Sequence, residues 1–402
     1  MNAATPNNDV FLVTQGGDED LSGFDGLDTF VFGGAFTGAD RVDGGAGNDV
    51  LALQGDYGAG VTFGAGVRDI ASVSLYASTN AQFGLQDDTL NSYALTTVDA
   101  NVAAGQQLRI NGANLAAGEN LTFNGAAETD GVFQVLGGRG RDVVTGGSGN
   151  DVVVFGPGGR FAEGDTVTGG AGYDVVYLKG NYVADLTAPG FAGAFAGVES
   201  IGLLSATNTE FVSAGGGTEF DYSITWSDAL LGAGQTITVN GSRLTTEESL
   251  AFNGSQETNG IFRIFGGGGN DVLTGGAGND LIFGGARGDT LTGGTGNDVF
   301  RYQSAEESNS TERDGIQDFN PGDLIDLSRI DAISGTAEND AFSFVGNAAF
   351  SGTAGQLRFE NISLGGPIWL VQGDTDGDGV SDFEVVLVIS PPDPITASDF
   401  LL

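Results

Sequence analysis

The chain has 402 residues, with 53 acidic side chains against 14 basic ones and a net charge of −39. Such a charge makes nucleic acid and anionic membranes unfavourable partners, and it opposes compaction unless cations bind to the folded form. The sequence contains no cysteine and no histidine, which excludes disulfides, thiol chemistry, the usual zinc ligand and the usual general base.

Residues 1–41 are predicted to form an N-terminal cap that contains one degenerate repeat. The segment GFDGLDTFVF, from Gly23, places Asp28 where the better copies described below carry their aspartate. The first residues have neither a basic start nor an apolar run, and nowhere do about 18 apolar residues follow one another. We therefore expect no Sec-type signal and no membrane insertion.

Residues 42–166 are predicted to form a first module, in which short repeats flank a glycine-poorer stretch. The repeat is a nonapeptide with glycine at its start, an acidic residue sixth and an apolar residue eighth. A single copy begins at Gly44 and carries Asp49, and two tandem copies follow later as GGRGRDVVT and GGSGNDVVV.

Residues 167–300 are predicted to form a second module that duplicates the first. The segment LTFNGAAETDGVFQVLGGRGRDVVTGGSGND from Leu121 recurs as LAFNGSQETNGIFRIFGGGGNDVLTGGAGND from Leu250, a shift of 129 residues (250 − 121 = 129). A single copy, GGAGYD, carries Asp174, and four tandem nonapeptides close the module between Gly266 and Arg301. The same fold is therefore expected in both modules.

The composition of the nonapeptide points to calcium. Its glycines allow backbone conformations closed to other residues, which brings peptide carbonyls beside the aspartates, and hard oxygen ligands of this kind suit Ca²⁺. The apolar residues point to one face, so stacked copies build a narrow core. With two turns in each coil, one edge recurs every second nonapeptide, which pairs Asp271 with Asp289 (289 − 271 = 18) and Asp280 with Asp298 (298 − 280 = 18).

The predicted ligands are the first, third and sixth residues of each tandem nonapeptide. In the second module they are Gly266, Gly268, Asp271, Gly275, Ala277, Asp280, Gly284, Ala286, Asp289, Gly293, Thr295 and Asp298. In the first module they are Gly137, Arg139, Asp142, Gly146, Ser148 and Asp151, and the single and degenerate copies add Asp28, Asp49 and Asp174. The third tandem copy of the second module has Arg287 fourth and Gly288 fifth, which predicts a weaker site.

The stretches between the nonapeptides, residues 53–130 and 178–260, admit two folds. Apolar runs in the first module recur about every ten to thirteen residues, a spacing that suits a parallel β-helix with slightly larger coils. A compact antiparallel β-domain inserted between the repeats is the alternative. Helical periodicity is nearly absent.

Residues 301–402 are predicted to cap the second module and to add acidic clusters. Asp314, Asp318 and Asp323 either complete the last metal sites or cap a short helix that begins near Ser328. The loop DTDGDGVSD spaces its acids as calcium loops do, although Val385 stands where such a loop carries glutamate and the apparent strand FEVVLVI follows. Its candidate ligands are Asp374, Asp376, Asp378 and Asp382.

The nonapeptides resemble those of RTX (repeats-in-toxin) proteins, whose glycine-aspartate repeats form a calcium-binding β-roll. The segment FRYQSAEESNSTERDGIQDFNPGDLIDLSRIDA resembles the region that follows the roll in serralysin-type secreted proteins, although the chain lacks the HExxH site of those proteases. The C-terminal ITASDFLL resembles an uncleaved type I secretion signal. The resemblance implies an all-β, right-handed parallel β-helix or β-roll solenoid with several Ca²⁺ ions, a duplicated module and a C-terminal β cap.

Three function classes follow, and no catalytic residue is expected in the first two. The first is a secreted structural protein that folds on extracellular Ca²⁺ and self-assembles at the surface of a Gram-negative bacterium, as a surface layer, filament or matrix. The second is a calcium-dependent adhesin or exopolysaccharide-binding protein, and the third is a polysaccharide-acting β-helix enzyme. Expected partners are other copies of the chain, cell-surface polysaccharide and the type I secretion machinery. Trp226 and Trp369 are expected in the core.

Overall fold

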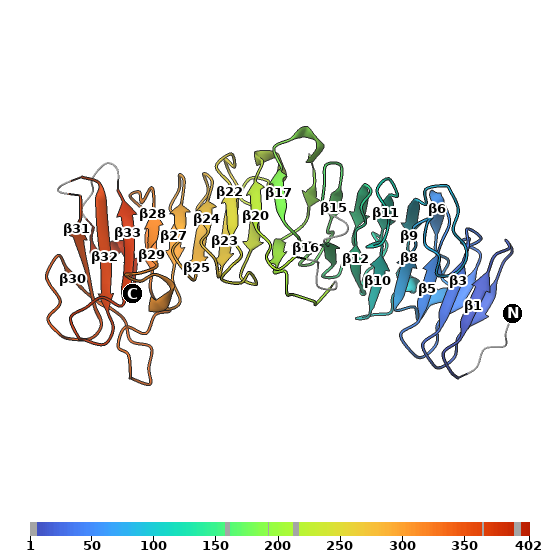
Figure 1. Ribbon diagram of the computed structural model, residues 1–402, viewed down its shortest axis with the longest axis horizontal. Coiled ribbons are helices and arrows are strands. Elements are labelled where there is room, and N and C mark those ends of the chain that lie inside the picture. Colours follow the sequence, from blue (N-terminus) through green and yellow to red (C-terminus); the bar gives the residue numbers. More distant parts are fainter. Residues whose placement is uncertain (1–5, 157–160, 192, 212–216, 364–365, 390–394) are drawn as a thin grey trace. The chain divides into compact units, whose positions relative to one another are not determined.

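The computed structural model describes residues 6–156, 161–191, 193–211, 217–363, 366–389 and 395–402 (Figure 1). These residues form β-strands and five short 3₁₀ turns, with no α-helix among them. By its contacts the chain divides into two compact units. Unit 1 comprises Met1–Lys179, Pro189–Ile201 and Thr209–Gly215, and unit 2 comprises Gly180–Ala188, Gly202–Asn208 and Gly216–Leu402.

Unit 1 is a parallel solenoid in which consecutive strands alternate between one long sheet and the strands opposite it. Its long sheet contains, in order, β1 (Val10–Val13), β3 (Thr29–Phe32), β5 (Val50–Leu53), β8 (Ser72–Leu75), β10 (Gln107–Asn111), β12 (Val132–Leu136), β14 (Val152–Phe155) and β16 (Val175–Lys179). The opposite strands are β2 (Asp20–Ser22), β4 (Arg41–Asp43) and β7 (Val67–Arg68), followed by β6 (Tyr57–Thr62), β9 (Tyr93–Thr96), β11 (Leu121–Asn124), β13 (Asp142–Thr145), β15 (Thr166–Thr168) and β18 (Phe195–Ala196). Strand β19 (Ser200–Leu204) begins in unit 1 and ends in unit 2.

Unit 2 repeats this winding and then ends in a partly antiparallel cap. One sheet contains β21 (Thr236–Asn240), β23 (Ile261–Gly267), β25 (Leu281–Gly285), β27 (Val299–Arg301), β29 (Leu324–Asp326) and β34 (Phe400–Leu401). The other contains β17 (Tyr182–Asp185), β20 (Tyr222–Thr225), β22 (Leu250–Asn253), β24 (Val272–Thr274), β26 (Thr290–Thr292) and β28 (Asp314–Ile316), and then the cap strands β33 (Phe383–Val388), β32 (Ile368–Asp374), β31 (Gln356–Asn361) and β30 (Ser343–Gly346). The 3₁₀ turns are η1 (Asp99–Asn101), η2 (Pro189–Phe191), η3 (Asp228–Leu230), η4 (Ala305–Glu307) and η5 (Ala397–Asp399).

The glycine-poorer stretches belong to the solenoid, which confirms the predicted fold and excludes the antiparallel inserted domain. In unit 1, β11 pairs in parallel with β9 and with β13, so the coils continue from this stretch into the nonapeptides without a break. In unit 2, β22 pairs in parallel with β20 and β24 in the same way. The boundaries at residues 41, 166 and 300 stay a prediction.

Alternation along each strand places one row of side chains inside the coils. The middle residues of the nonapeptide strands, such as Leu273 and Ile282, are fully buried. In the larger coils phenylalanines fill the extra space: Phe123 and Phe133 meet edge to face at 4.9 Å, and their duplicates Phe252 and Phe262 meet at 5.1 Å. Trp226 is fully buried against this second pair, as expected, whereas Trp369 lies half-buried in the cap against Phe359.

The cap departs from the sequence-based expectation at one point. No helix begins near Ser328; the chain turns there, because Asp326 accepts hydrogen bonds from both the N–H and the hydroxyl of Ser328 and closes a local turn instead. The strand expected after the acidic loop is present as β33.

Candidate calcium-binding site

Aspartates of successive coils in unit 2 stack in the pairs that the 18-residue spacing predicts. Oδ1 of Asp289 accepts a hydrogen bond from the backbone N–H of Asp271 at 2.8 Å. Oδ1 of Asp298 accepts one from the N–H of Asp280, also at 2.8 Å. We call each such series of carboxylates, in which one coil's side chain accepts the N–H of the previous coil, an aspartate ladder. Both ladders are buried.

Residues beyond the nonapeptides continue the two ladders. Asp314 accepts the N–H of Asp289 at 2.8 Å, and Asp323 accepts the N–H of Asp298 at 2.9 Å. Asp318 is bound from the side, because its two oxygens accept the N–H groups of consecutive glycines of the fourth nonapeptide at 2.8 Å each. All three aspartates therefore belong to the end of the roll and cap no helix.

The second oxygen of a ladder carboxylate, Oδ2, takes no part in the ladder hydrogen bond. In Asp271, Asp289 and Asp298 this Oδ2 atom is buried and has no hydrogen-bond partner among the described residues. In Asp280 it accepts the N–H of Gly276 at 2.7 Å. A buried carboxylate oxygen without a partner is costly, and a bound hard cation removes that cost. The ladder therefore fits Ca²⁺ by the chemistry of its orphaned oxygens.

The first glycine of each nonapeptide leaves space for this Oδ2 atom. A Cβ atom on Gly266 would lie 2.2 Å from Oδ2 of Asp271, and one on Gly284 would lie 2.2 Å from Oδ2 of Asp289. The same holds for Gly275 and Gly293, at 2.4 and 2.3 Å from the aspartates of their own copies. Because any side chain would displace the carboxylate, the first position requires glycine.

The third residues of the nonapeptides join neighbouring coils through their backbone. Ala277, Ala286 and Thr295 donate their N–H groups to carbonyls of the preceding coil at 2.9 to 3.0 Å. In unit 1, Arg139 and Ser148 do the same at 3.2 and 3.0 Å. For Gly268, the counterpart in the first tandem copy of unit 2, a Cβ atom would lie 2.9 Å from the backbone of the preceding coil.

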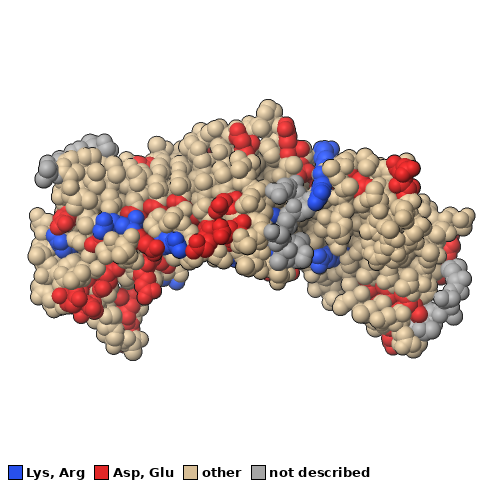
Figure 2. Space-filling view, in the orientation of Figure 1, with Lys and Arg blue, Asp and Glu red and all other residues tan. Residues whose placement is uncertain are grey.

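Burial makes the ladder carboxylates resist ionisation without a cation. It raises the pKa of Asp271 to about 7 and that of Asp298 to about 7. Burial and the neighbouring Asp314 both raise the pKa of Asp289. Acidic side chains also gather at the surface, and Figure 2 shows several patches of them on one face, some with basic side chains beside them. At neutral pH a buried carboxylate of a ladder is therefore more stable with a bound divalent cation than as an uncompensated anion.

Unit 1 contains corresponding ladders with longer spacings. Asp49 accepts the N–H of Asp28 at 2.7 Å, a separation of 21 residues. Asp174 accepts the N–H of Asp151 at 2.7 Å, a separation of 23 residues. The aspartates of the single copies therefore do have ladder partners, at separations that the 18-residue spacing does not predict. Among these residues, Asp28, Asp49 and Asp174 also carry a buried Oδ2 without a hydrogen-bond partner in the described structure.

Two further hydrogen bonds extend the ladders of unit 1. Asp165, which sequence reasoning missed, accepts the N–H of Asp142 at 2.7 Å, and Glu199 accepts that of Asp174 at 2.7 Å. The first glycines of the tandem copies in unit 1 also pack against their own aspartates. A Cβ atom on Gly137 would lie 2.7 Å from Oδ2 of Asp142, and one on Gly146 would lie 2.3 Å from Oδ2 of Asp151. The signal for Asp165 was an aspartate that follows Asp142 by 23 residues, at the end of the segment FAEGD.

Comparison with known proteins places the chain in a family. The family model described as "Peptidase M10 serralysin C terminal" matches residues 18–402. The chain belongs to the serralysin C-terminal family. No curated protein matches it. Two solution structures are similar in part, both of subunits from the mannuronan C5-epimerase of Azotobacter vinelandii. AlgE6R3 is 25% identical over 44% of this chain and 82% of its own, with a TM-score of 0.25, and AlgE6R2 is 26% identical over 45% and 92%, with a TM-score of 0.24.

Family, fold and buried carboxylate ladders together make this serralysin C-terminal chain a calcium-binding β-roll protein of a secreted type. Among the residues that the structure describes, no helix has the length and hydrophobicity that a membrane crossing needs.

The third tandem nonapeptide differs from the others at its fourth residue, Arg287, and the weaker site expected there stays a prediction. Arg287 has a φ of 72°, in the left-handed region that glycine prefers, which costs about 1–2 kcal/mol. Its guanidinium leaves the roll and contacts Glu247 at 3.1 Å. Asp289 of the same copy is nevertheless held in its ladder, so the altered turn keeps its carboxylate in place.

The acidic loop of the cap brings together three of its four predicted ligands. Asp374, Asp376 and Asp382 each place a carboxylate oxygen within 4.8 Å of the others. Asp374 is fully buried, with its oxygens accepting the N–H groups of Gly377 and Gly379. Asp378, the fourth predicted ligand, lies outside this cluster and accepts the N–H of Val380 in a local turn.

Two buried glutamates that sequence reasoning missed close the turns of the larger coils. Glu119 accepts N–H groups of Ser78, Asn91 and Ala116, and its duplicate Glu248 accepts three backbone N–H groups in the same way. Burial acts to raise the pKa of Glu119, but these backbone hydrogen bonds outweigh it and lower the pKa. The signal was a glutamate repeated at the 129-residue shift.

Proposed function

We propose that this calcium-binding β-roll protein has a structural role without catalysis. It folds on extracellular Ca²⁺ and assembles at a bacterial surface as a layer, filament or matrix. The observation that carries the proposal is the edge formed by β1, which has one partner strand, β3, among the described residues. The outward side chains of β1, Val10 and Leu12, are 62% and 51% exposed.

An apolar parallel edge of this kind is a template for a strand of another molecule. The last strand of the corresponding sheet in unit 2, β34, carries Leu401, which is 43% exposed. Contact between the first edge of one copy and the last edge of the next is heterologous, and such contacts continue into open filaments unless the rotation closes a ring. The protein is exported by the type I secretion machinery in this proposal, and calcium then fixes the coils whose edges associate.

A pair of substitutions on β1 tests the proposal. Val10→Lys with Leu12→Lys places two charges on the edge and leaves the inward residues of β1 in place. We expect wild-type protein in millimolar calcium to form particles larger than a monomer in sedimentation velocity and ordered assemblies in negative-stain electron microscopy. The double variant is expected to stay monomeric while its calcium-dependent circular dichroism is unchanged.

The matched control is Leu90→Lys, because Leu90 is 57% exposed and lies in a loop away from the sheet edges. This variant should assemble as the wild type does. A wild-type protein that is fully folded in calcium and monomeric at every concentration tested would contradict the assembly proposal and leave calcium binding intact.

A second candidate function, binding of an acidic cell-surface polysaccharide, is favoured by a groove in unit 1. The groove has a volume of about 670 Å³, and its lining includes the amides of Gln106, Gln107 and Gln134, the guanidinium of Arg109 and the carboxylate of Asp69. Nε of Arg109 is buried without a hydrogen-bond partner among the described residues, and Nη2 donates to the carbonyl of Phe211 at 3.1 Å. An unsatisfied guanidinium among amides suits the carboxylate of a uronic acid.

Calorimetric titration with an oligogalacturonate separates this candidate from the first. We expect binding that Arg109→Gln weakens at least about tenfold, the loss of one charge-assisted hydrogen bond of roughly 1.5–3 kcal/mol. A neutral cello-oligosaccharide is the control ligand and should bind to neither protein. Equal binding of both sugars, or of neither, contradicts this candidate.

A further inference from the structure

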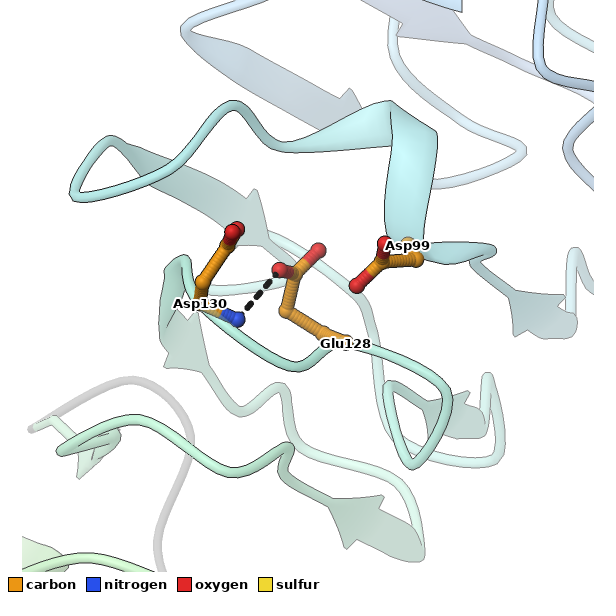
Figure 3. Close-up of side chains that lie close together, drawn as sticks. All are labelled: Asp99, Glu128 and Asp130. Atoms are coloured by element: carbon orange, nitrogen blue, oxygen red, sulfur yellow. Dashed lines mark hydrogen bonds between the residues drawn. The ribbon is translucent and has the colours of Figure 1, made fainter.

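A cluster of three carboxylates lies outside the ladders, between two coils of unit 1. Asp99 belongs to the turn η1, and Glu128 and Asp130 belong to the turn between β11 and β12. One oxygen of each lies within 4.8 Å of the other two, and Figure 3 shows the Glu128 carboxylate between the other two side chains. The cluster contains no residue of a nonapeptide.

Glu128 shows that the cluster is more than a group of surface acids. Its side chain is fully buried, and Oε1 accepts the N–H groups of Thr129, Asp130 and Gly131 at 3.1, 3.2 and 2.8 Å. Its other oxygen, Oε2, is buried and has no hydrogen-bond partner among the described residues. A buried carboxylate oxygen left in this state beside two further carboxylates is stabilised by a bound cation.

Asp99 is also held in position before any ligand arrives. Its Oδ1 accepts hydrogen bonds from the N–H and the hydroxyl of Thr129 at 3.0 and 2.6 Å. The two anchored carboxylates come from different coils, so a cation between them joins η1 to the following turn. Because the ligands are already ordered, little conformational entropy is lost on binding.

We propose that Asp99, Glu128 and Asp130 form a calcium site that clamps these two coils of unit 1 independently of the ladders. Three carboxylates supply hard oxygen ligands, and the exposure of Asp99 and Asp130 leaves room for the water ligands that complete the six to eight oxygens of Ca²⁺. The partial exposure places the dissociation constant in the range of extracellular modules, about 10⁻⁴–10⁻³ M. The site does not depend on assembly of the protein.

The duplicated module provides a natural comparison that lacks one carboxylate. The 129-residue shift maps the three residues onto Asp228, Glu257 and Asn259. Asp228 accepts from the N–H and hydroxyl of Thr258 at 2.8 and 2.6 Å, and Glu257 accepts the N–H of Gly260 at 2.8 Å. Glu257 also has a buried Oε2 without a partner in the described structure.

Similar hydrogen bonds therefore hold the aspartate and the glutamate of both clusters, and the third member differs in charge. Asn259 contributes an amide, which donates to the hydroxyl of Thr258 at 3.0 Å. The cluster of unit 2 has two carboxylates where that of unit 1 has three, so it binds calcium more weakly.

Calcium binding by the full chain tests the inference with variants that keep side-chain shape. In equilibrium dialysis at a free calcium concentration near 1 mM, Asp130→Asn should bind about 0.5–0.9 ion fewer per chain than the wild type, the occupancy that a dissociation constant of about 10⁻⁴–10⁻³ M gives. Asn259→Asp should bind correspondingly more, and Asp88→Asn, an exposed acid outside both clusters, is the control and should leave the number unchanged. All three positions are exposed and lie outside the ladders, so the variants are expected to fold.

Anomalous diffraction from crystals soaked in terbium distinguishes this site from the ladders. The inference requires a peak among Asp99, Glu128 and Asp130 in the wild type, which Asp130→Asn removes while the ladder peaks remain. Occupied ladders without this peak, or an unchanged ion count in Asp130→Asn, overturn the inference alone. A map without any metal peak overturns it together with calcium binding by the roll.

Discussion

At the scale of single residues, the ladders depend on the space left by a missing Cβ atom. Gly284 is the clearest case, because a Cβ atom there would lie 2.2 Å from Oδ2 of Asp289. That oxygen is buried and has no hydrogen-bond partner in the described structure. Neither solvent nor a protein donor therefore compensates its charge. The glycine and the cation are thus linked requirements of one site.

Gly284→Ala is predicted to destabilise the calcium-bound protein by about 1–3 kcal/mol, because the methyl group displaces the carboxylate from the ladder. Urea unfolding in millimolar calcium measures the loss. The control is Gly16→Ala, since a Cβ atom on Gly16 meets nothing within 4 Å. Equal stability of the two variants would contradict the prediction, because it would mean that Oδ2 of Asp289 can move aside for a methyl group without cost.

Asp271→Asn with Asp289→Asn is predicted to weaken calcium binding and to leave the metal-free fold intact. The amide oxygen can still accept the ladder N–H, and the substitution removes two carboxylates whose pKa values burial raises. We expect the rise in melting temperature on adding calcium to shrink, while the melting temperature in EDTA stays the same or increases. Asp88→Asn with Glu338→Gln, two exposed acids, is the control and should retain the full calcium-dependent rise.

At the scale of coils and strands, regular spacing decides what the sequence can predict. The four tandem nonapeptides have equal lengths, so their spacing alone pairs Asp271 with Asp289 correctly. Elsewhere the coils differ in length, and ladder partners lie 21, 23 or 25 residues apart. Asp174, for example, is bonded to Asp151 of the preceding coil and to Glu199 of the following one, at separations of 23 and 25 residues. A constant period does not predict these partners, because the separation depends on the length of the loops in each coil.

The cluster of Asp99, Glu128 and Asp130 shows a different limit of prediction from sequence. Asp99 and Glu128 lie 29 positions apart in the chain, and nothing in their local sequence resembles a calcium loop. They meet because η1 and the next turn occupy the same edge of consecutive larger coils. The predicted solenoid indicated that these coils stack, but the register that joins the two turns required the structure.

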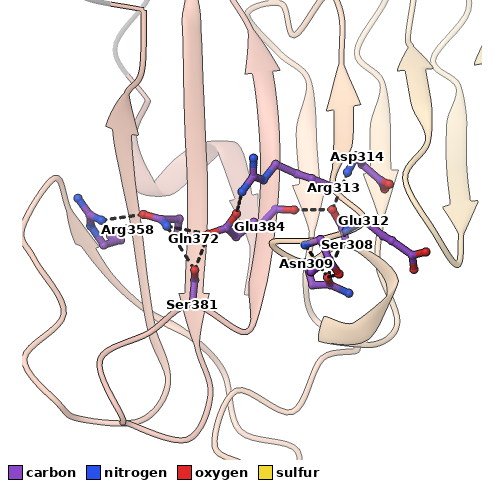
Figure 4. A network of polar contacts seen from close by, with 10 residues as sticks. Ser308, Asn309, Glu312, Arg313, Asp314, Arg358, Gln372, Ser381 and Glu384 are labelled. Carbon is purple, nitrogen blue, oxygen red and sulfur yellow. Dashed lines mark hydrogen bonds and ion pairs between the residues drawn. The ribbon is translucent and has the colours of Figure 1, made fainter.

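Besides the pairing of β33 with β28, one buried glutamate joins the cap to the last coils. Glu384 on β33 forms an ion pair with Arg313 and accepts hydrogen bonds from Gln372 at 2.9 Å and Ser381 at 2.5 Å (Figure 4). Its backbone carbonyl accepts the hydroxyl of Ser308. Burial acts to raise the pKa of Glu384, but the bonds from Ser381, Gln372 and Arg313 outweigh it and lower the pKa.

Arg313→Gln is predicted to destabilise unit 2 by roughly 1–3 kcal/mol, because it leaves a buried carboxylate without its charged partner. The loss should be measurable by urea unfolding above about pH 5 and should fade as the pH falls and Glu384 takes up a proton. Adding Glu384→Gln to this variant should recover part of the stability, since the uncompensated charge is gone. No recovery in the double variant would mean that the pair contributes little coupling.

At the scale of the whole molecule, the net charge of −39 sets opposite pH dependences for the metal-free and calcium-bound forms. Burial raises the pKa of Asp142 to about 7 and that of Asp174 to about 6, well above the unfolded value of about 3.9. Such groups contribute stability that is fully present below pH 3.9 or so and is lost as the pH rises through 6 to 7. Calcium requires the ionised form, so its contribution grows over the same range.

Chelation is therefore predicted to lower the melting temperature strongly near pH 8 and only slightly near pH 5. Thermal melts followed by circular dichroism, in EDTA and in millimolar calcium at both pH values, measure the difference. Groups with lowered pKa values, such as Glu384, have the opposite pH dependence, but they lie outside the ladders, act alike in both forms and cancel in the comparison. A β spectrum and a melting temperature that stay unchanged after full chelation at pH 8 would refute calcium-dependent folding, because the buried carboxylates would then be charged without a cation and at no cost.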